Sequence, residues 1–331
     1  MPHHLIYVIL SGFDVVSLAA VIGALSCRAW VIPPEGIDLI HPRVWRLLAW
    51  ALFALTLSSV ALLAGRTLEM SRQPLSAIGP ILPLVIRKTQ FGHIWLARMG
   101  CIVLLWMFWM AGRRSARGAK VSLAMLVLGA AIAFTRSATG HPADGGQFTF
   151  PEWLDWVHLV TASVWAGSVF AMIFGVFPSL WAARSVSPRV VAALAEQLSR
   201  VASIALAFVL ASGLVSAWHY VVHVDNLWRT IYGRILLVKL SLIGVAVLLG
   251  AANRYLHVPR IRRWAGAGTA QPEPAAPSAT SDRSAALAPL ARTIAVEALF
   301  LLGVLLVAAL LLHTASPSDM SAMAAMTPGQ R

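Results

Sequence analysis

The chain has 331 residues, of which 59% are hydrophobic and only 12% are charged, and its mean hydropathy is +0.76. A water-soluble domain of this size carries a far more polar surface, so this composition excludes a soluble globular protein and predicts an integral membrane protein. The formal net charge of +13 does not indicate nucleic-acid binding, because the basic residues lie mainly in loops between apolar stretches.

Eight apolar stretches are each long enough to cross a bilayer as a helix, which takes about 20 residues for a hydrocarbon core of roughly 30 Å. The stretches are continuously apolar rather than alternating, which favours helices over barrel strands. In chain order they span residues 5–30, 44–65, 92–112, 121–139, 153–178, 201–220, 231–256 and 293–313. The predicted fold class is therefore an all-α polytopic membrane protein with eight transmembrane helices.

The first stretch is interpreted as a retained span rather than a signal peptide, because no Lys or Arg precedes it and Asp14 lies within it. Most Lys and Arg residues lie in the loops after the first, third, fifth and seventh spans. By the positive-inside rule these loops are cytoplasmic, so both termini are expected to be periplasmic. Residues 266–288, rich in Ala, Pro and Ser, are predicted to form a flexible cytoplasmic linker, and residues 315–331 a periplasmic tail.

An internal repeat is indicated by spacing. Thr89, Gly92 and Arg98 recur 141 positions later as Thr230, Gly233 and Lys239. Upstream, Asp14, Ser17 and Gly23 lie 144 positions before His158, Thr161 and Gly167. Because each copy has an even number of spans, both copies point the same way through the membrane. The sequence thus predicts two parallel four-helix repeats, residues 1–140 and 141–331.

Most of the ten histidines fall on or near the predicted periplasmic face, and imidazole is a common ligand of copper, zinc and iron. His158 lies inside the fifth span, where an ionisable group is costly and usually functional, although a hydrogen bond to a neighbouring helix would also explain it. His219 and His223 share a helix face only if the helix continues past Tyr220. His141 begins the loop after the fourth span.

The tail contains three methionines, whose thioether sulfur suits Cu(I); a low-complexity Ala/Ser/Met tail is the alternative interpretation. Together the candidate metal ligands are His158, His141, His219, His223, Met320, Met323 and Met326.

Several ionisable residues are expected inside the membrane, where they must pair or line a wet cavity. On the periplasmic side these are Asp14, Arg98, Arg136, Lys239 and His313. They indicate either ion pairs that hold the two repeats together, with Asp14 bound to Arg98 or Lys239, or a polar cavity that opens outward. On the cytoplasmic side a structural network is expected from Asn253, Arg254, Arg292 and Glu297, with Arg292 or Arg254 as the partner of Glu297.

No catalytic residues are predicted. The chain has no GxxxxGK[ST] motif, so we expect no nucleotide-driven activity. Its two cysteines, Cys27 and Cys101, lie far apart within predicted helices and do not indicate a disulfide framework.

Four segments in order resemble the copper-resistance protein D (CopD) family of bacterial inner-membrane proteins: DWVHLVTASVWAGS, TIYGRILLVKL, AANR and RTIAVEALFLLG. TQFGHIWLARM is similar to the corresponding first-half segment. The matching positions are His158, Trp165, Gly167, Tyr232, Gly233, Lys239, Asn253, Arg254, Arg292 and Glu297. The resemblance implies a protein that moves copper, as Cu(I) or Cu(II), inward across the membrane or aids copper tolerance. It also implies a separate periplasmic CopC-like copper-binding partner.

Two other functions stay open from the residues alone. A b-type haem redox protein would use histidines in the bundle as ligands of the haem iron. The side chains of Arg98, Arg136 and Lys239 would neutralise the haem propionates. A membrane scaffold for a periplasmic copper-binding partner would use the same polar residues for assembly only.

Overall fold

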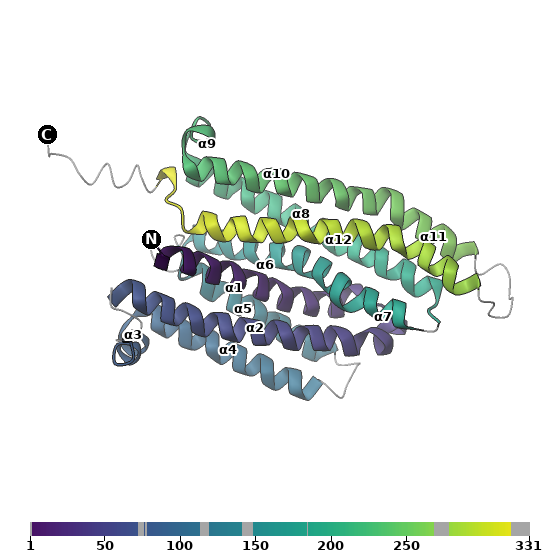
Figure 1. Cartoon of the computed structure of the whole chain (residues 1–331), viewed down its shortest axis with the longest axis horizontal. Coiled ribbons are helices and arrows are strands. Elements are labelled where there is room, and N and C mark those ends of the chain that lie inside the picture. The colour runs from purple at the N-terminus through teal and green to yellow at the C-terminus, as the bar shows by residue number, and fades with distance from the viewer. Residues whose placement is uncertain are drawn as a thin grey trace.

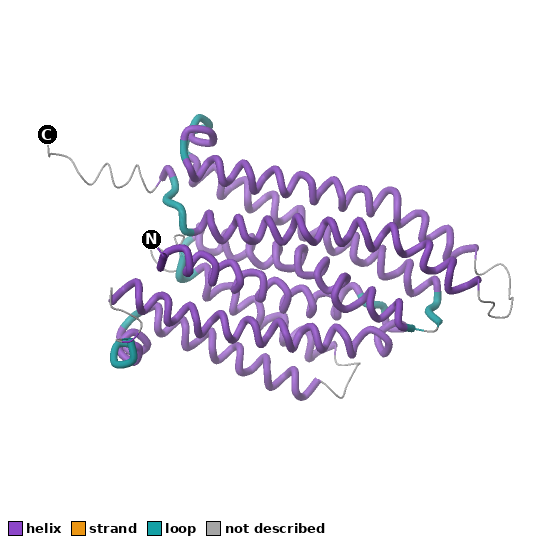
Figure 2. The backbone as a smooth tube through the Cα atoms, in the orientation of Figure 1, coloured by secondary structure: helices purple, strands orange, loops and turns teal. Residues whose placement is uncertain are grey.

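A computed structural model describes residues 2–71, 76, 78–112, 119–140, 148–183, 185–267 and 278–318 of the chain. Within these ranges every regular element is helical. The long helices run side by side along one axis and form a bundle (Figure 1). Figure 2 shows that the short loops lie at the two ends of this bundle. We call these the α9 end, which holds α3, α9 and the start of α1, and the α11 end, which holds α7 and α11 (Figure 1).

The first half of the chain forms four long helices. They are α1 (Pro2–Ser26), which continues into the π-helix η1 (Cys27–Val31), then α2 (Ile37–Ser71), α4 (Gln90–Gly112) and α5 (Ala119–Ser137). The 3-10 helix η2 (Pro34–Gly36) precedes α2, and the short α3 (Leu82–Lys88) precedes α4.

The second half has the same order of long helices. They are α6 (Phe150–Ala171), which continues into η5 (Met172–Val176) and α7 (Phe177–Ala182), then α8 (Pro188–Val221), α10 (Ile231–Ala252) and α12 (Ser278–Leu312). The short α9 (Asn226–Arg229) precedes α10, which continues through η6 (Asn253–His257) into α11 (Val258–Ala267). The expected flexible linker covers residues 266–288, of which residues 268–277 lie outside the described residues. Because α11 ends at Ala267 and α12 begins at Ser278, the expectation is wrong for residues 266–267 and 278–288. The alanines among residues 278–288 favour a helix that extends the last apolar stretch.

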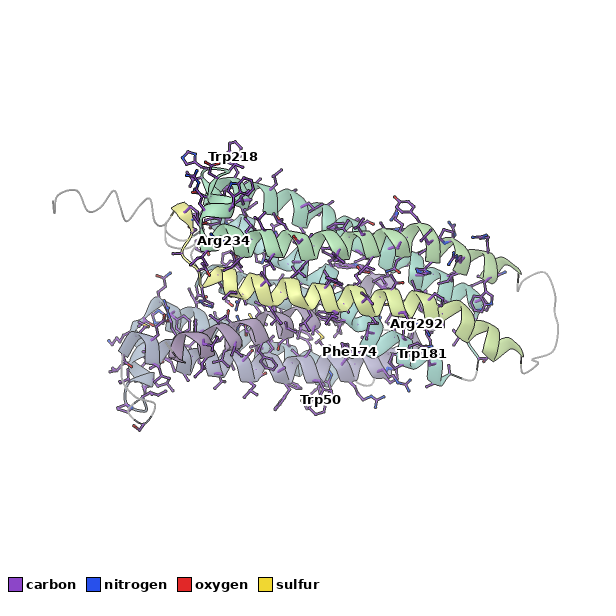
Figure 3. The ribbon with its side chains drawn as sticks, turned by 45° about the horizontal axis from the view of Figure 1, so that its top comes forward. Trp50, Phe174, Trp181, Trp218, Arg234 and Arg292 are labelled. Atoms are coloured by element: carbon purple, nitrogen blue, oxygen red, sulfur yellow. The ribbon has the colours of Figure 1, made fainter. Side chains whose placement is uncertain are left out.

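Seven of the described helical segments are long and apolar enough to cross a membrane, which confirms a polytopic helical protein. They are Leu5–Val31, Pro34–Ser71, Gln90–Gly112, Phe150–Ala182, Pro188–Trp218, Ile231–Gly266 and Leu287–Leu312. The fourth expected span corresponds to the shorter apolar helix Val121–Ser137. Large apolar side chains such as Trp50, Phe174 and Trp181 lie exposed on the outside of the bundle, as lipid contact requires (Figure 3).

The centre of the bundle is the crossing of α1 and α6, where two glycines meet. A Cβ atom built on Gly23 would lie 1.9 Å from the carbonyl carbon of Gly167. One built on Gly167 would lie 1.9 Å from the carbonyl oxygen of Ala19. The two backbones are therefore in direct contact, and no side chain fits between them. Small residues at such crossings allow the close packing that associates helices in membranes.

The turns into α4 and α10 have the same local structure. Thr89 donates its hydroxyl proton to Val85 O (2.6 Å) and accepts from Gly92 N (3.0 Å). Thr230 donates to the carbonyl oxygen of Asn226 (2.7 Å) and accepts from Gly233 N (3.0 Å). These pairs lie 141 positions apart, so the repeated spacing corresponds to a repeated structural motif. The division into two four-helix repeats itself remains a prediction.

Candidate functional site

The first of three polar clusters surrounds Asp14, whose side chain is completely buried on α1. Arg98 Nη2 lies 2.7 Å from Oδ1 and 2.9 Å from Oδ2 of this carboxylate. Arg136 Nη1 lies 2.9 Å from Oδ2, and Ser58 Oγ donates to Oδ1 at 2.8 Å. Charge-assisted hydrogen bonds of this length are the strong ones. One carboxylate thus holds two arginines.

The two arginines also reach serines on neighbouring helices. Arg98 Nε donates to Ser59 Oγ at 2.9 Å, and Arg136 Nη2 donates to Ser11 Oγ at 2.7 Å. We call these six residues the Asp14 cluster; it links α1, α2, α4 and α5. The expected pairing of Asp14 with Arg98 is present, whereas the expectation that this set holds the two halves together is wrong for the described contacts. Lys239 lies on α10 in the other half, where it interacts with Asp155.

A cavity of about 260 Å³ opens beside the Asp14 cluster at the α9 end. Arg98, Arg136 and His313 line it together with Tyr7, whose ring centroid lies 5.1 Å from that of His313. Three of the five expected outer-side residues thus line one cavity, and a fourth, Asp14, binds its two arginines. We call it the arginine cavity.

The second cluster lies around His158 on α6. His158 Nδ1 lies 2.9 Å from Ser212 Oγ on α8. The Ser212 hydroxyl proton is directed to Phe208 O at 2.6 Å, so its oxygen acts as the acceptor for His158. His158 therefore carries its proton on Nδ1. This tautomer leaves the lone pair of Nε2 available to a ligand.

Two further ionisable residues belong to this His158 cluster. Asp155 accepts a 2.6 Å hydrogen bond from Ser137, and it interacts electrostatically with Lys239 and Arg136. Lys239 also interacts with His158. Lys239 is half-buried and makes no hydrogen bond or ion pair with a described residue. Sequence reasoning missed Asp155, although its position one turn before His158 on a helix places the two on one face.

The Asp14 and His158 clusters use matching contacts. In each half a serine of the second long helix bonds the ionisable residue of the first: Ser58 with Asp14, and Ser212 with His158. The chemistry differs, because the first half has an ion pair and the second half an imidazole near a lysine.

The third cluster is formed by Glu297, Asn253 and Trp165, between α6, α10 and α12. Glu297 is buried; it accepts from Asn253 Nδ2 at 3.0 Å and from Trp165 Nε1 at 3.3 Å. The amide oxygen of Asn253 has no hydrogen-bond partner among the residues that the structure describes. A cavity of about 190 Å³ is lined by all three residues.

The expected arginine partners of Glu297 do not bind it. Arg254 instead donates to Ser199 and Ser203 on α8, at 3.2 and 3.1 Å. Arg292 is exposed on the outer face of α12 (Figure 3). Glu297 lies more than a turn beyond Arg292 and faces inward, so the rotation of α12 separates them. Within the described ranges, Glu297 therefore has neutral hydrogen-bond donors and no ion-pair partner.

Most of the candidate metal ligands lie outside the described part of the chain. His141, Met320, Met323 and Met326 lie outside the described residues, as does the side chain of His219. The helix does not continue from His219 through His223, as a shared helix face would require, because α8 ends at Val221. Val222 then takes a positive φ of 62°, which places His223 outside that helix. Among the described side chains, no group of three His, Cys, Asp or Glu is positioned to hold a metal ion.

Comparison with known proteins gives two family matches. Residues 1–147 match the family described as Copper resistance protein D-like, N-terminal domain, and residues 192–311 match the family described as Copper resistance protein D. No solved structure matches the chain significantly.

Three curated relatives are similar. The Copper transport protein CutJ of Bacillus subtilis is 28% identical over 52% of this chain and 32% of its own length. The chain thus spans about a third of that relative. The Inner membrane protein YebZ of Escherichia coli is 28% identical over 75% of this chain and 82% of its own. Copper resistance protein D of Pseudomonas syringae pv. tomato is 29% identical over 65% of this chain and 69% of its own.

Proposed function

The chain belongs to the copper resistance protein D family and is a multi-pass protein of the inner membrane, and we propose a function from this premise. We propose that the protein moves copper across that membrane. Copper is the cargo rather than a resident cofactor. Import that supplies or redistributes copper, in cooperation with a separate periplasmic copper-binding protein, is the direction that we favour. Relatives named for copper transport and copper resistance support this proposal.

The hydrogen bond between His158 Nδ1 and Ser212 is the observation that carries the proposal. Histidines that bind metals commonly use one ring nitrogen for the metal and donate the other N–H to a partner, which fixes the ring. The hydrogen bond from Nδ1 to Ser212 is a partner of this kind, and it directs the lone pair of Nε2 away from Ser212. Imidazole nitrogen binds both oxidation states of copper. A single imidazole also binds weakly enough for a transported ion to leave.

The Glu297 cluster supplies a second polar position along the same bundle. Trp165 follows His158 by seven residues on α6, which is about two helical turns and about 10 Å along the same face. Trp165 in turn donates to Glu297. The buried carboxyl group of Glu297, which has no ion-pair partner among the described residues, offers oxygen ligands to a cation that has passed His158. We therefore assign Glu297 and the Asn253 amide oxygen to the cytoplasmic side of the path.

Capture precedes these two positions. We assign it to His141, His219, His223 and the methionines of the tail at a periplasmic face that includes both termini. Thioether and imidazole groups suit copper that arrives from a periplasmic donor. This arrangement rests on eight spans in two parallel repeats, residues 1–140 and 141–331, with α5 as the fourth span.

Elemental analysis of the detergent-purified protein, after incubation with copper and desalting, tests the proposal. We expect bound copper in the wild-type protein and a loss of at least tenfold in affinity in His158→Ala. His93→Ala is the matched control, because His93 is an exposed histidine in the first turn of α4. Equal copper binding by the His158 variant and the wild type would contradict the role of His158. A Soret band that shifts on reduction would instead support a haem protein, and a metal-free protein that still binds its partner would support a scaffold.

A further inference from the structure

The arginine cavity in the first half is not explained by copper transport, because its lining is positively charged. Its ionic lining residues are Arg66, Arg98, Arg136 and Glu69. Arg66 is paired with Glu69 at 2.7 Å, so these two charges cancel. The remaining two arginines share the single carboxylate of Asp14. A copper cation is repelled from such a surface, whereas an anion is attracted to it.

Donor groups of both arginines are still available. Nη1 of Arg98 and Nε of Arg136 make no hydrogen bond to any residue that the structure describes, although both side chains are almost completely buried. A buried arginine is costly when its positive charge is not neutralised and when no described residue accepts from its N–H groups. An anionic ligand would supply both the negative charge and the acceptor atoms. The planar guanidinium group is particularly suited to phosphate oxygens.

The other carboxylates near the cavity, among the described residues, do not remove this excess. Asp155 is the second carboxylate that interacts with Arg136, but it also interacts with Lys239 and accepts its hydrogen bond from Ser137. Asp155 and Asp14 do not line the cavity; the arginines do. The surface that a ligand meets therefore presents two guanidinium groups, and the carboxylates lie behind them.

The cavity also has the size and neutral lining of a small polar site. Its volume of about 260 Å³ exceeds the roughly 30 Å³ occupied by one water molecule several-fold. Tyr7, Trp95 and Thr135 line it beside the arginines. Trp95 Nε1 donates a hydrogen bond to the carbonyl oxygen of Ser59, which fixes the position of the indole ring at the side of the cavity.

We propose that the arginine cavity, formed by α1, α2, α4, α5 and the end of α12, binds a phosphate group through Arg98 and Arg136. The phosphate comes either from the headgroup of an anionic phospholipid in the surrounding leaflet or from a free anion in the aqueous phase. The ion pairs to Asp14 hold both guanidinium groups in position for it. In the described part of the second half, His158 occupies the position equivalent to Asp14, and no pair of arginines binds it.

Binding is tested on the full chain in two preparations. In the first, the protein in nanodiscs of phosphatidylcholine is titrated with inorganic phosphate at constant ionic strength, and binding is measured by calorimetry. In the second, phosphatidylglycerol is added to the nanodiscs, and lipid retained by the protein is measured by native mass spectrometry. Binding in the first preparation supports a free anion, and retention only in the second supports a lipid headgroup. Absence of both overturns the proposal.

Three variants test whether binding depends on the net positive charge of the arginine cavity. Arg136→Gln removes one positive charge and leaves the ion pair of Arg98 with Asp14, so we expect binding to weaken at least tenfold. Asp14→Asn combined with Arg136→Gln restores the excess positive charge, and binding is expected to recover. Arg229→Gln, at an exposed arginine of the same end, changes the net charge of the chain equally and is expected to leave binding unchanged. Equal binding by Arg136→Gln and the wild type, or equal weakening by Arg229→Gln, overturns the proposal.

Discussion

Gly23 on α1 and Gly167 on α6 are in backbone contact at the centre of the bundle, and they are also the two glycines that the repeated spacing places at equivalent positions. An axis that relates the two halves would pass close to a contact between equivalent residues. The contact therefore supports the proposed pair of parallel repeats, and it makes the crossing sensitive to any added atom.

Gly167→Ala is expected to lower the free energy of unfolding by about 1–3 kcal/mol, the usual effect of overpacking a close contact. The new methyl group would overlap the carbonyl oxygen of Ala19, which is backbone and cannot rotate away. Thermal unfolding in detergent measures the change. Gly244→Ala is the control, because nothing lies within 4 Å of the Cβ position there. That helical substitution should leave the free energy of unfolding unchanged or raise it. A similar decrease at both sites would show that the close backbone contact at the α1–α6 crossing is not the cause.

Ser212→Ala is expected to weaken copper binding by about 10- to 100-fold without unfolding the protein. The substitution removes the acceptor that fixes the Nδ1 proton of His158 and orients its ring. Copper titration of the purified protein checks this, with Ser241→Ala as the control at an exposed serine that bonds only its own helix. An unchanged affinity in Ser212→Ala would mean that this hydrogen bond does not prepare His158 for copper.

Glu297→Gln is expected to slow copper transport while the protein stays folded. The carboxyl group offers Oε1 to Trp165 and Oε2 to Asn253, whereas the amide keeps only one acceptor oxygen and cannot carry a negative charge. Glu297→Ala leaves both donors buried without an acceptor, and we expect it to cost about 1–3 kcal/mol of stability as well. Copper uptake into proteoliposomes and thermal unfolding are measured together. The control is Glu196→Gln, which removes the carboxylate of an ion pair with Arg262 at the surface. Transport at the wild-type rate in Glu297→Gln would show that the role of Glu297 is structural only.

Asp14→Asn is expected to destabilise the protein by about 3–5 kcal/mol, because it leaves two buried guanidinium groups without their carboxylate. Adding Arg136→Gln should recover part of this loss. Glu69→Gln breaks the exposed pair with Arg66 and should cost only about 0–1 kcal/mol. Equal unfolding midpoints for the Asp14 and Glu69 variants would contradict the importance that we assign to burial of this ion pair.

Labelling of single cysteines tests the orientation in the membrane. Arg229→Cys lies at the α9 end and Arg262→Cys at the α11 end, and both side chains are mostly exposed. In a background without Cys27 and Cys101, a membrane-impermeant thiol reagent should label position 229 in intact cells with a permeable outer membrane. Position 262 should react only after the inner membrane is opened. The reverse pattern would invert the proposed direction of capture.

Much of the architecture could be predicted from the sequence because the bilayer imposes a simple constraint. Backbone groups in hydrocarbon must be satisfied within their own segment, so long apolar runs form helices wherever they occur. The turn motif at Thr89 and Thr230 was also predictable from spacing, since it depends on residues within one turn. The importance of Asp14, Arg98, His158 and Glu297 followed from the cost of ionisable groups in a membrane.

The partners of these residues were decided only by tertiary structure. Arg98 and Lys239 occupy equivalent positions in the sequence, yet only Arg98 reaches Asp14, because the packing of α4 against α2 and α5 brings it there. Glu297 bonds Asn253 and Trp165 rather than Arg254 or Arg292, because the rotation of α12 turns Arg292 outward. Local sequence determines that a helix forms and where it is apolar, whereas the rotation and crossing of each helix depend on contacts with residues more than a hundred positions away, such as Gly23 with Gly167.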